Sequence, residues 1–283
     1  MKLHIKHETR YQYENPVKER YSELRLKPKS IGIQNCLDFQ LRLVPESQVS
    51  HYLDFYLNDV HFFDISIPHI EHEVVLEAVV ELQEYQALPR PESAIIWDHL
   101  GECATNEACY DFLGTSPLVN LNVSVWRLAQ DISLSRQDLW EDVESISHFV
   151  YEYLTYDQSA TTVNTRVDDV IECKAGVCQD FAHVMVGICR SLNIPARYVS
   201  GYLYQGNQDI KARGTEASHA WVEAYLPNFG WRAFDPTNDR VVDDHYVTIA
   251  VGRDYSDVAP VKGTYKGVSA ESMEVSVQVN ETT

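Results

Sequence analysis

Ala-Gly-Val-Cys-Gln-Asp-Phe-Ala-His, residues 175–183, opens the stretch of this chain that decides its fold. Apolar side chains recur along it and beyond it at intervals of three and four residues, which is the spacing of one helix face. The pattern ends at Asn193-Ile-Pro195, because proline cannot continue a helix. We therefore predict a helix that begins near Cys178 and whose apolar face consists of Phe181, Val184, Met185, Ile188 and Leu192.

Cys178 lies in the first turn of this predicted helix. Gly176 just upstream allows a sharp turn, and Asp180 stands where the helix dipole favours an anion. The free N–H groups of a helix N-terminus favour the thiolate, which is the reactive form of cysteine, and they can also hold an oxyanion. Cys189, well inside the helix, fits the commoner role of a buried and unreactive thiol.

Two further segments predict a β-hairpin. Ser218–Leu226 alternates between its two faces, Pro-Asn-Phe-Gly (227–230) is a turn signal, and Trp231–Asp235 resumes as a strand. Direct pairing of His219 with Asp235 needs a turn centre one or two residues earlier than the apparent one. A bulge or a diagonal contact would close that gap, and the sequence leaves the register open.

A thiol, an imidazole and a carboxylate in this order are the parts of a cysteine nucleophile with its base and its orienting group. Taken singly, each residue has an ordinary explanation: a histidine on a strand is usually structural, and a carboxylate before proline usually forms a turn. In combination, Cys178, His219 and Asp235 predict a catalytic triad.

These segments resemble the transglutaminase-like superfamily of papain-fold cysteine enzymes, and within it a bacterial branch of candidate cysteine proteases. One departure is Leu57, where that branch often has glycine before the asparagine that follows. The resemblance rests on residues 176–183, 193–202, 218–223 and 230–237, on 9–13, 24–28 and 52–54 in the N-terminal region, and on 252–260.

The resemblance implies a nucleophile at Cys178, a base at His219 and an orienter at Asp235. It also implies acyl transfer through a thioester and requires no cofactor. It leaves the acceptor open, which is water in a hydrolase and an amine in a crosslinking enzyme.

The expected fold class is α+β, with an N-terminal all-β, sandwich-like domain before a papain-like, transglutaminase-like core in which the nucleophile helix packs on an antiparallel sheet. Residues 1–86 contain short strands separated by turn signals, and the alternation is clearest from Val74 to Leu82. Residues 87–93, Ala-Leu-Pro-Arg-Pro-Glu-Ser, are typical of a linker.

Residues 94–283 are expected to form the catalytic core. A helical pattern spans Arg136–Tyr153, with Ser135 as its N-cap. Alternation from Met273 to Val279 predicts a C-terminal strand that closes this core.

The excess of acidic residues argues against one class of function, the binding of nucleic acids. With 23 basic and 42 acidic residues the net charge is −19, which argues against binding a nucleic-acid backbone. The sequence contains neither a long apolar run nor the apolar core of a secretory signal, and its six cysteines are widely spread. We therefore expect a cytoplasmic protein without a membrane span. The sequence does not fix its oligomeric state.

Other candidate site residues are less specific. Tyr156 is a candidate oxyanion donor because it precedes the nucleophile on the approach segment. Tyr202 and Trp221 either line the cleft or pack in the core. Cys173 and Cys178 are spaced too widely for a structural zinc site, so we expect no metal.

The function predicted first is a cysteine-dependent hydrolase of amide, peptide or isopeptide bonds that acts on a peptide or protein. The alternatives are transglutaminase-type acyl transfer to an amine and a non-catalytic binding module. Intact Cys178, His219 and Asp235 argue against the binding module, because a scaffold needs none of the three.

Overall fold

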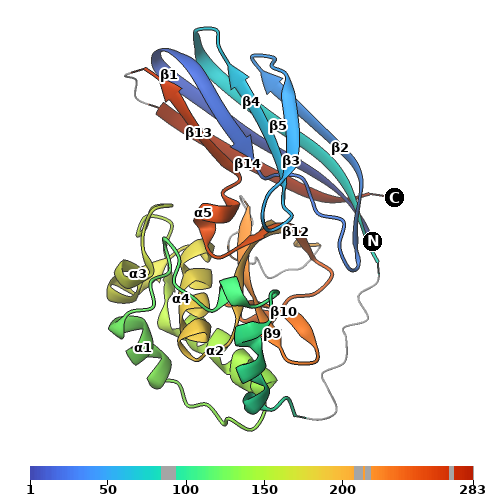
Figure 1. Cartoon of the computed structure of the whole chain (residues 1–283). Helices are drawn as coiled ribbons and strands as arrows, with labels where there is room; N and C mark the ends of the chain where they lie inside the picture. Colours follow the sequence, from blue (N-terminus) through green and yellow to red (C-terminus); the bar gives the residue numbers. More distant parts are fainter. Residues whose placement is uncertain (84–93, 207–212, 214–217, 268–270, 283) are drawn as a thin grey trace.

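The computed structural model describes residues 1–83, 94–206, 213, 218–267 and 271–282. Its strands and helices form a β domain and, beneath it in Figure 1, a core in which helices pack on one antiparallel sheet. The two ends of the chain lie near each other at one end of the β domain (Figure 1). The predicted α+β class and the helix-on-sheet core are confirmed.

Within the described residues the β domain is a seven-stranded sheet of β1 (Lys2–Leu24), β2 (Gln34–Val44), β3 (Val49–Leu53), β4 (Asp59–Ile65), β5 (His69–Leu82), β13 (Val261–Lys266) and β14 (Glu271–Thr282). The long strand β1 organises it. The first half of β1 lies between β5 and β14, and the second half pairs with β4 and β13. β2 extends the sheet beside β5, and β3 extends it beside β4.

The two halves of this sheet face each other across a shared core. Phe63 of β4 and His72 of β5 stand 5.5 Å apart between ring centroids, although their strands belong to different halves. The predicted alternation of β5 is confirmed, because Val74, Leu76 and every second residue after them are buried. One apolar face and one polar face are what a half-buried strand requires.

The C-terminal strand lies elsewhere than expected. β14 pairs with β1 over its whole length, from Lys2 opposite Thr282 to Tyr13 opposite Glu271, so it belongs to the β domain. The prediction that it closes the core is therefore wrong. Alternation indicates which face of a strand is buried, but it does not indicate which strand it pairs with. The predicted linker, residues 87–93, lies outside the described residues.

The core sheet has the strand order β11-β10-β9-β8-β12 and is antiparallel throughout. A short parallel pair, β6 with β7, stands before the helix α4. The strands are β6 (Thr155–Tyr156), β7 (Ala175–Gly176), β8 (Ala196–Leu203), β9 (His219–Leu226), β10 (Gly230–Asp235), β11 (Arg240–Val241) and β12 (Tyr246–Gly252). The helices are η1 (Trp97–Thr105), η2 (Tyr110–Phe112), α1 (Val123–Gln130), α2 (Leu139–Tyr153), α3 (Val167–Cys173), α4 (Cys178–Ser191) and α5 (Tyr255–Val258).

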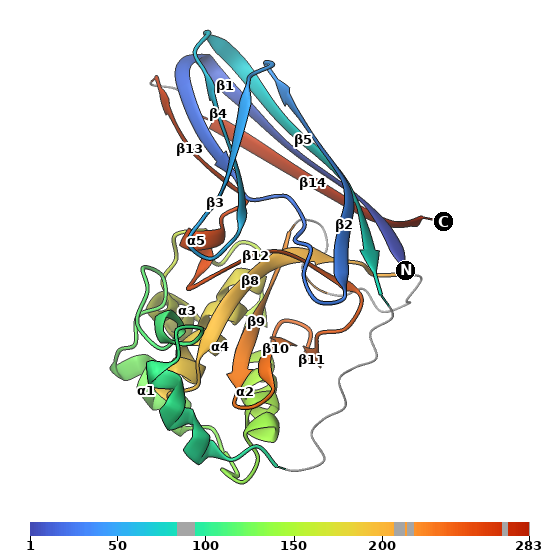
Figure 2. The ribbon, with the colours of Figure 1, turned by 45° about the vertical axis from the view of Figure 1, so that its right-hand side comes forward.

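Helix α4 is the centre of the core. It packs against β8 and β9 on one side and against α1, α2 and α3 on the other (Figure 2). Every residue from Gln179 to Arg190 is buried, which explains why its sequence is apolar nearly all round. Gly187 lets α1 approach closely, because a Cβ there would press on Val125.

Helix α2 begins three residues later than predicted. Asp138 caps it by accepting from the Trp140 N–H, whereas the Ser135 N–H donates to Asp142 Oδ1 at 2.7 Å. Arg136 has a φ of 53°, in the left-handed region, and so cannot belong to a right-handed helix. Ser135 is therefore part of the turn before α2 and not its N-cap.

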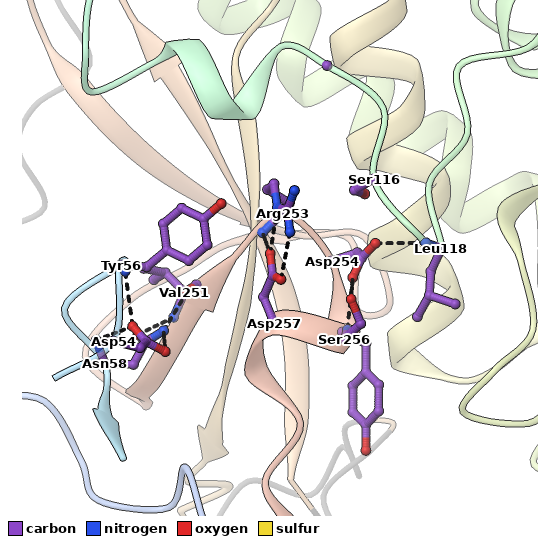
Figure 3. A network of polar contacts seen from close by, with 12 residues as sticks. Asp54, Tyr56, Asn58, Ser116, Leu118, Val251, Arg253, Asp254, Ser256 and Asp257 are labelled. Atoms are coloured by element: carbon purple, nitrogen blue, oxygen red, sulfur yellow. Dashed lines mark hydrogen bonds and ion pairs between the residues drawn. The ribbon is translucent and has the colours of Figure 1, made fainter. Parts of the chain in front are cut away.

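The β domain is fastened to the core by polar contacts around β12 (Figure 3). The side chain of Asn58, between β3 and β4, donates to Val251 O at 2.8 Å and accepts from Val251 N at 2.9 Å. The Asp54 carboxylate holds this turn by accepting from the side chain of Asn58 (Figure 3). The buried His7 and Tyr202 join the two parts through a 2.9 Å hydrogen bond.

The segment that follows β12 reaches α4. Asp254, fully buried, accepts from the Leu118 N–H at 2.8 Å and caps α5 through Ser256 (Figure 3). The next N–H, that of Tyr255, donates to His183 Nε2 of α4 at 3.1 Å. The segment that joins the β domain to the core therefore also contacts α4 directly.

Candidate active site

Cys178 is the first residue of α4, as predicted, and its side chain is partly exposed. The turn before it is held by Asp180, whose Oδ2 accepts from the Val177 N–H at 2.8 Å and from the Thr161 hydroxyl at 2.6 Å. Gly176 is required there, because a Cβ would collide with the Asp180 carboxyl. The N–H groups of the first turn of α4 therefore point toward the N-terminal end of the helix, where the Cys178 thiol lies.

His219 and Asp235 come from neighbouring strands of the predicted hairpin. Phe234 pairs with Val222, so the register sets Asp235 across from Trp221 and diagonal to His219. The diagonal contact is made: His219 Nε2 and Asp235 Oδ2 lie 2.7 Å apart, and both side chains are fully buried. This is the diagonal alternative left open by the sequence, and no bulge is needed.

The buried pair is strongly coupled. Burial opposes a charge on His219, but the negative charge of Asp235 and the hydrogen bond to it raise the pKa of the imidazole to about 10. The Cys178 thiol is the next group that raises this pKa, so it lies beside the ring. His219 Nδ1 has no partner of ordinary hydrogen-bond geometry among the described residues, and with Nε2 bound to Asp235 it is the nitrogen left for the thiol.

Asp235 accepts hydrogen bonds from several groups in addition to His219. Burial opposes its ionisation, yet His219 and side-chain hydrogen bonds from Asn238 and Tyr246 keep the pKa of Asp235 below its usual range. Oδ1 accepts from the Thr237 N–H at 2.9 Å, and Oδ2 accepts from Asn238 Nδ2 at 2.8 Å and the Tyr246 hydroxyl at 2.7 Å. The Asp235 carboxylate is therefore fixed on both oxygens.

Sequence reasoning missed these donors. The contact with Thr237 could have been found, because an aspartate before Pro-Thr-Asn is typical of a turn in which the carboxylate accepts from the N–H two residues on. Tyr246 gave no such signal, since it starts β12 and reaches Asp235 only through the strand order of the sheet.

The three less specific candidates lie in different places. Tyr156 of β6 pairs with Gly176 of β7, just before α4, and its ring centroid lies 6.3 Å from that of Phe181. Tyr202 is fully buried and hydrogen-bonded to His7 at the junction with the β domain, so it offers no surface to a substrate. Of the two alternatives for this residue, packing in the core is the one observed.

Trp221 is buried behind the proposed triad. Its ring centroid lies 6.2 Å from that of His219 and 5.2 Å from that of Tyr246, and its side chain is 1% exposed. Gly201 on β8 makes room for this indole, because a Cβ there would collide with it. Trp221 therefore packs against the catalytic candidates and does not line a cleft.

Two further residues near Cys178, His183 and Cys173, have contacts of their own. The fully buried His183 accepts the Tyr255 N–H through Nε2, and burial lowers its pKa to about 4, so its ring is neutral. The Cys173 thiol donates to Ala175 O at 3.2 Å and is exposed.

Comparisons with known proteins agree with this architecture. The sequence profile of the transglutaminase-like superfamily matches residues 127–236, and that of the bacterial transglutaminase-like N-terminal region matches residues 3–81. An uncharacterised protein of Mycobacterium leprae is 32% identical over 98% of this chain and 98% of its own length. The chain belongs to the transglutaminase-like superfamily.

A solved structure shows the same fold. The crystal structure of a candidate cysteine protease from Cytophaga hutchinsonii covers 100% of this chain and 92% of its own, with a TM-score of 0.76 and 24% identity. A protein-glutamine gamma-glutamyltransferase of Pseudomonas aeruginosa is 32% identical over 34% of this chain, which is 14% of that enzyme. Among the described residues, no helix has the length and apolar character needed to cross a membrane.

Proposed function

We propose that this protein is a cysteine-dependent hydrolase of amide, peptide or isopeptide bonds that uses Cys178, His219 and Asp235. The observation that carries the proposal is the 2.7 Å contact between His219 and Asp235, buried beside a cysteine at a helix N-terminus. In this arrangement Cys178 would be the nucleophile, His219 the base beside it and Asp235 the group that orients His219. Catalytic triads are recognised by this geometry and these roles.

The first half-reaction forms a thioester. His219 takes the proton of Cys178, the thiolate attacks the substrate carbonyl, and the N–H of Cys178 stabilises the oxyanion. The imidazolium then gives its proton to the leaving amine as the C–N bond breaks. Asp235 keeps the ring oriented and stabilises the imidazolium, a role that its burial and its donors support.

The second half-reaction returns the enzyme. His219 deprotonates a water molecule, which attacks the thioester, and the acid product leaves as Cys178 regains its proton. We propose Tyr156 as the second oxyanion donor, because β6 and β7 place it beside the turn that precedes Cys178. We further propose a peptide or protein as substrate.

Transfer to an amine is the second candidate. The same thioester would react with a primary amine in place of water, and the named activity of the Pseudomonas relative favours this alternative. The binding module is the weakest candidate, because a buried histidine–carboxylate pair is costly to maintain without a use. We place the protein in the cytoplasm, which its free cysteines, one of them exposed, support.

Peptide-library profiling with and without millimolar primary amine tests this assignment. Wild type is expected to release free acid, and Cys178→Ala is expected to release nothing while retaining the fold. A predominant amine adduct would establish the transferase instead. Turnover that survives Cys178→Ala would remove the triad from the reaction.

A further inference from the structure

One carboxylate oxygen in the site has three donors. Asp235 Oδ2 accepts from His219 Nε2 at 2.7 Å, from Asn238 Nδ2 at 2.8 Å and from the Tyr246 hydroxyl at 2.7 Å. A carboxylate oxygen shared in this way divides its basicity among its donors. The hydrogen bond between Asp235 and the protonated imidazole is therefore weaker than it would be if His219 were the sole partner of this oxygen.

Tyr246 is held in place by rigid neighbours. It begins β12, is 4% exposed, and packs edge-on against Trp221, with ring centroids 5.2 Å apart at 79°. Its centroid also lies 6.1 Å from that of His219. The Tyr246 ring therefore cannot move its hydroxyl away from Asp235 without disturbing its packing against Trp221.

The hydroxyl must act as a donor. Burial and the negative charge of Asp235 raise the pKa of Tyr246 above its ordinary value, so the phenol keeps its proton. Arg240 on β11 and Asp243 in the turn before β12 are the other charged groups that act on it. The groups that act on His219 are Asp235 and Cys178.

We propose that Tyr246 is a positioning residue of the triad, whose hydroxyl shares Asp235 Oδ2 with His219 and thereby limits how firmly the imidazolium holds its proton. The inference rests on the proposed function, in which His219 must give that proton to the leaving amine. A general acid works best when its pKa is near the operating pH, so an unmoderated Asp235 would make His219 too weak an acid.

The test is the titration of His219 by NMR in protein with isotope-labelled histidine. Cys178→Ala serves as the background, because it removes the titration of the thiol. Adding Tyr246→Phe removes one charge-assisted donor, and the midpoint of His219 should rise by about one pH unit. Tyr202→Phe is the matched control, since it removes an equally buried hydroxyl that bonds His7, and it should leave the midpoint unchanged.

Asn238→Ala removes the other side-chain donor to the same oxygen and should also raise the midpoint, which covers the case in which Tyr246→Phe fails to fold. An unchanged or lowered midpoint in the folded variants would overturn the proposal. Failure of the proposed function would look different: the labelling rate of Cys178 in otherwise wild-type protein would not depend on His219, whatever Tyr246 does to the titration.

Discussion

Asn58 pairs with Val251 as a backbone group would, because its side-chain amide donates to the carbonyl and accepts from the N–H of that one residue. The contact joins the turn between β3 and β4 to β12, and Asn58 is fully buried. Since β12 leads into the segment that contacts α4 through His183, this pair links the β domain to the helix that begins at Cys178.

Asn58→Ala should lower the free energy of unfolding by about 2–3 kcal/mol, because it leaves the N–H and carbonyl of Val251 buried without partners. Chemical denaturation measures the change. Asn280→Ala, at an exposed position on β14, is the control and should have little effect. A loss of less than about 0.5 kcal/mol, the range of ordinary surface substitutions, would show that the docking does not depend on Asn58.

Leu57→Gly should stabilise the protein. Leu57 has a φ of 57° and is 67% exposed, so glycine would relieve a left-handed backbone while sacrificing little burial. The free energy of unfolding should rise by about 0.5–1 kcal/mol. This gain is the cost of a left-handed backbone at leucine minus the larger conformational entropy that glycine loses on folding. Leu57→Ala, which keeps the strained backbone, should show no such gain. Equal stability of the two variants would contradict this explanation.

This position shows how sequence and structure complement each other. The resemblance marked Leu57 as a departure from a frequent glycine, but only the backbone angle supplies the reason. The hairpin could be predicted because alternation and turn residues are local signals. The diagonal contact of His219 with Asp235 could not, since it depends on a register that local signals leave open by one or two residues.

Longer-range relationships were harder to predict. Tyr246 and the pairing of β14 with β1 both depend on which strands become neighbours, and no period in the sequence encodes that. Trp221 had a clear place on a strand face, but its burial depends on β8 coming to lie beside β9 and on β12 coming to lie beside β8. The nucleophile helix was the easiest element, because turn, capping carboxylate, apolar stripe and closing proline agree along one short segment.

The buried pair predicts a particular dependence of stability on pH. The pKa of His219 is about 10 in the folded protein and near 6.5 when unfolded, so its protonation stabilises the fold fully below about pH 6.5. That contribution is lost as the pH rises through 10. The difference in unfolding free energy between wild type and His219→Gln should therefore shrink from pH 6.5 to 10. A difference that grew over this range would show that the ring is neutral in the fold.

Substitutions in the triad should differ in severity. Cys178→Ala should abolish turnover, and His219→Ala should reduce it by about 10³-fold or more, because it removes the general base. Asp235→Ala should be milder, on the order of 10²-fold, since an orienting group usually costs less than the nucleophile. Steady-state kinetics on a peptide found by profiling would measure these losses. Wild-type kinetics in Asp235→Ala would assign the orienting role to another group.

In the proposed mechanism, His219 activates Cys178. Mass-spectrometric mapping after limiting iodoacetamide treatment tests it near pH 6.5, where ordinary thiols are protonated. Burial raises the pKa values of Cys36 and Cys103, and it raises those of Cys109 and Cys189 to about 12, so the exposed Cys173 is the relevant internal reference.

We expect Cys178 to be labelled at least about ten times faster than Cys173 in wild type, and we expect His219→Ala to remove this advantage while Tyr202→Phe preserves it. Labelling of Cys178 no faster than that of the other cysteines, or equally fast with and without His219, would contradict activation of Cys178 by His219.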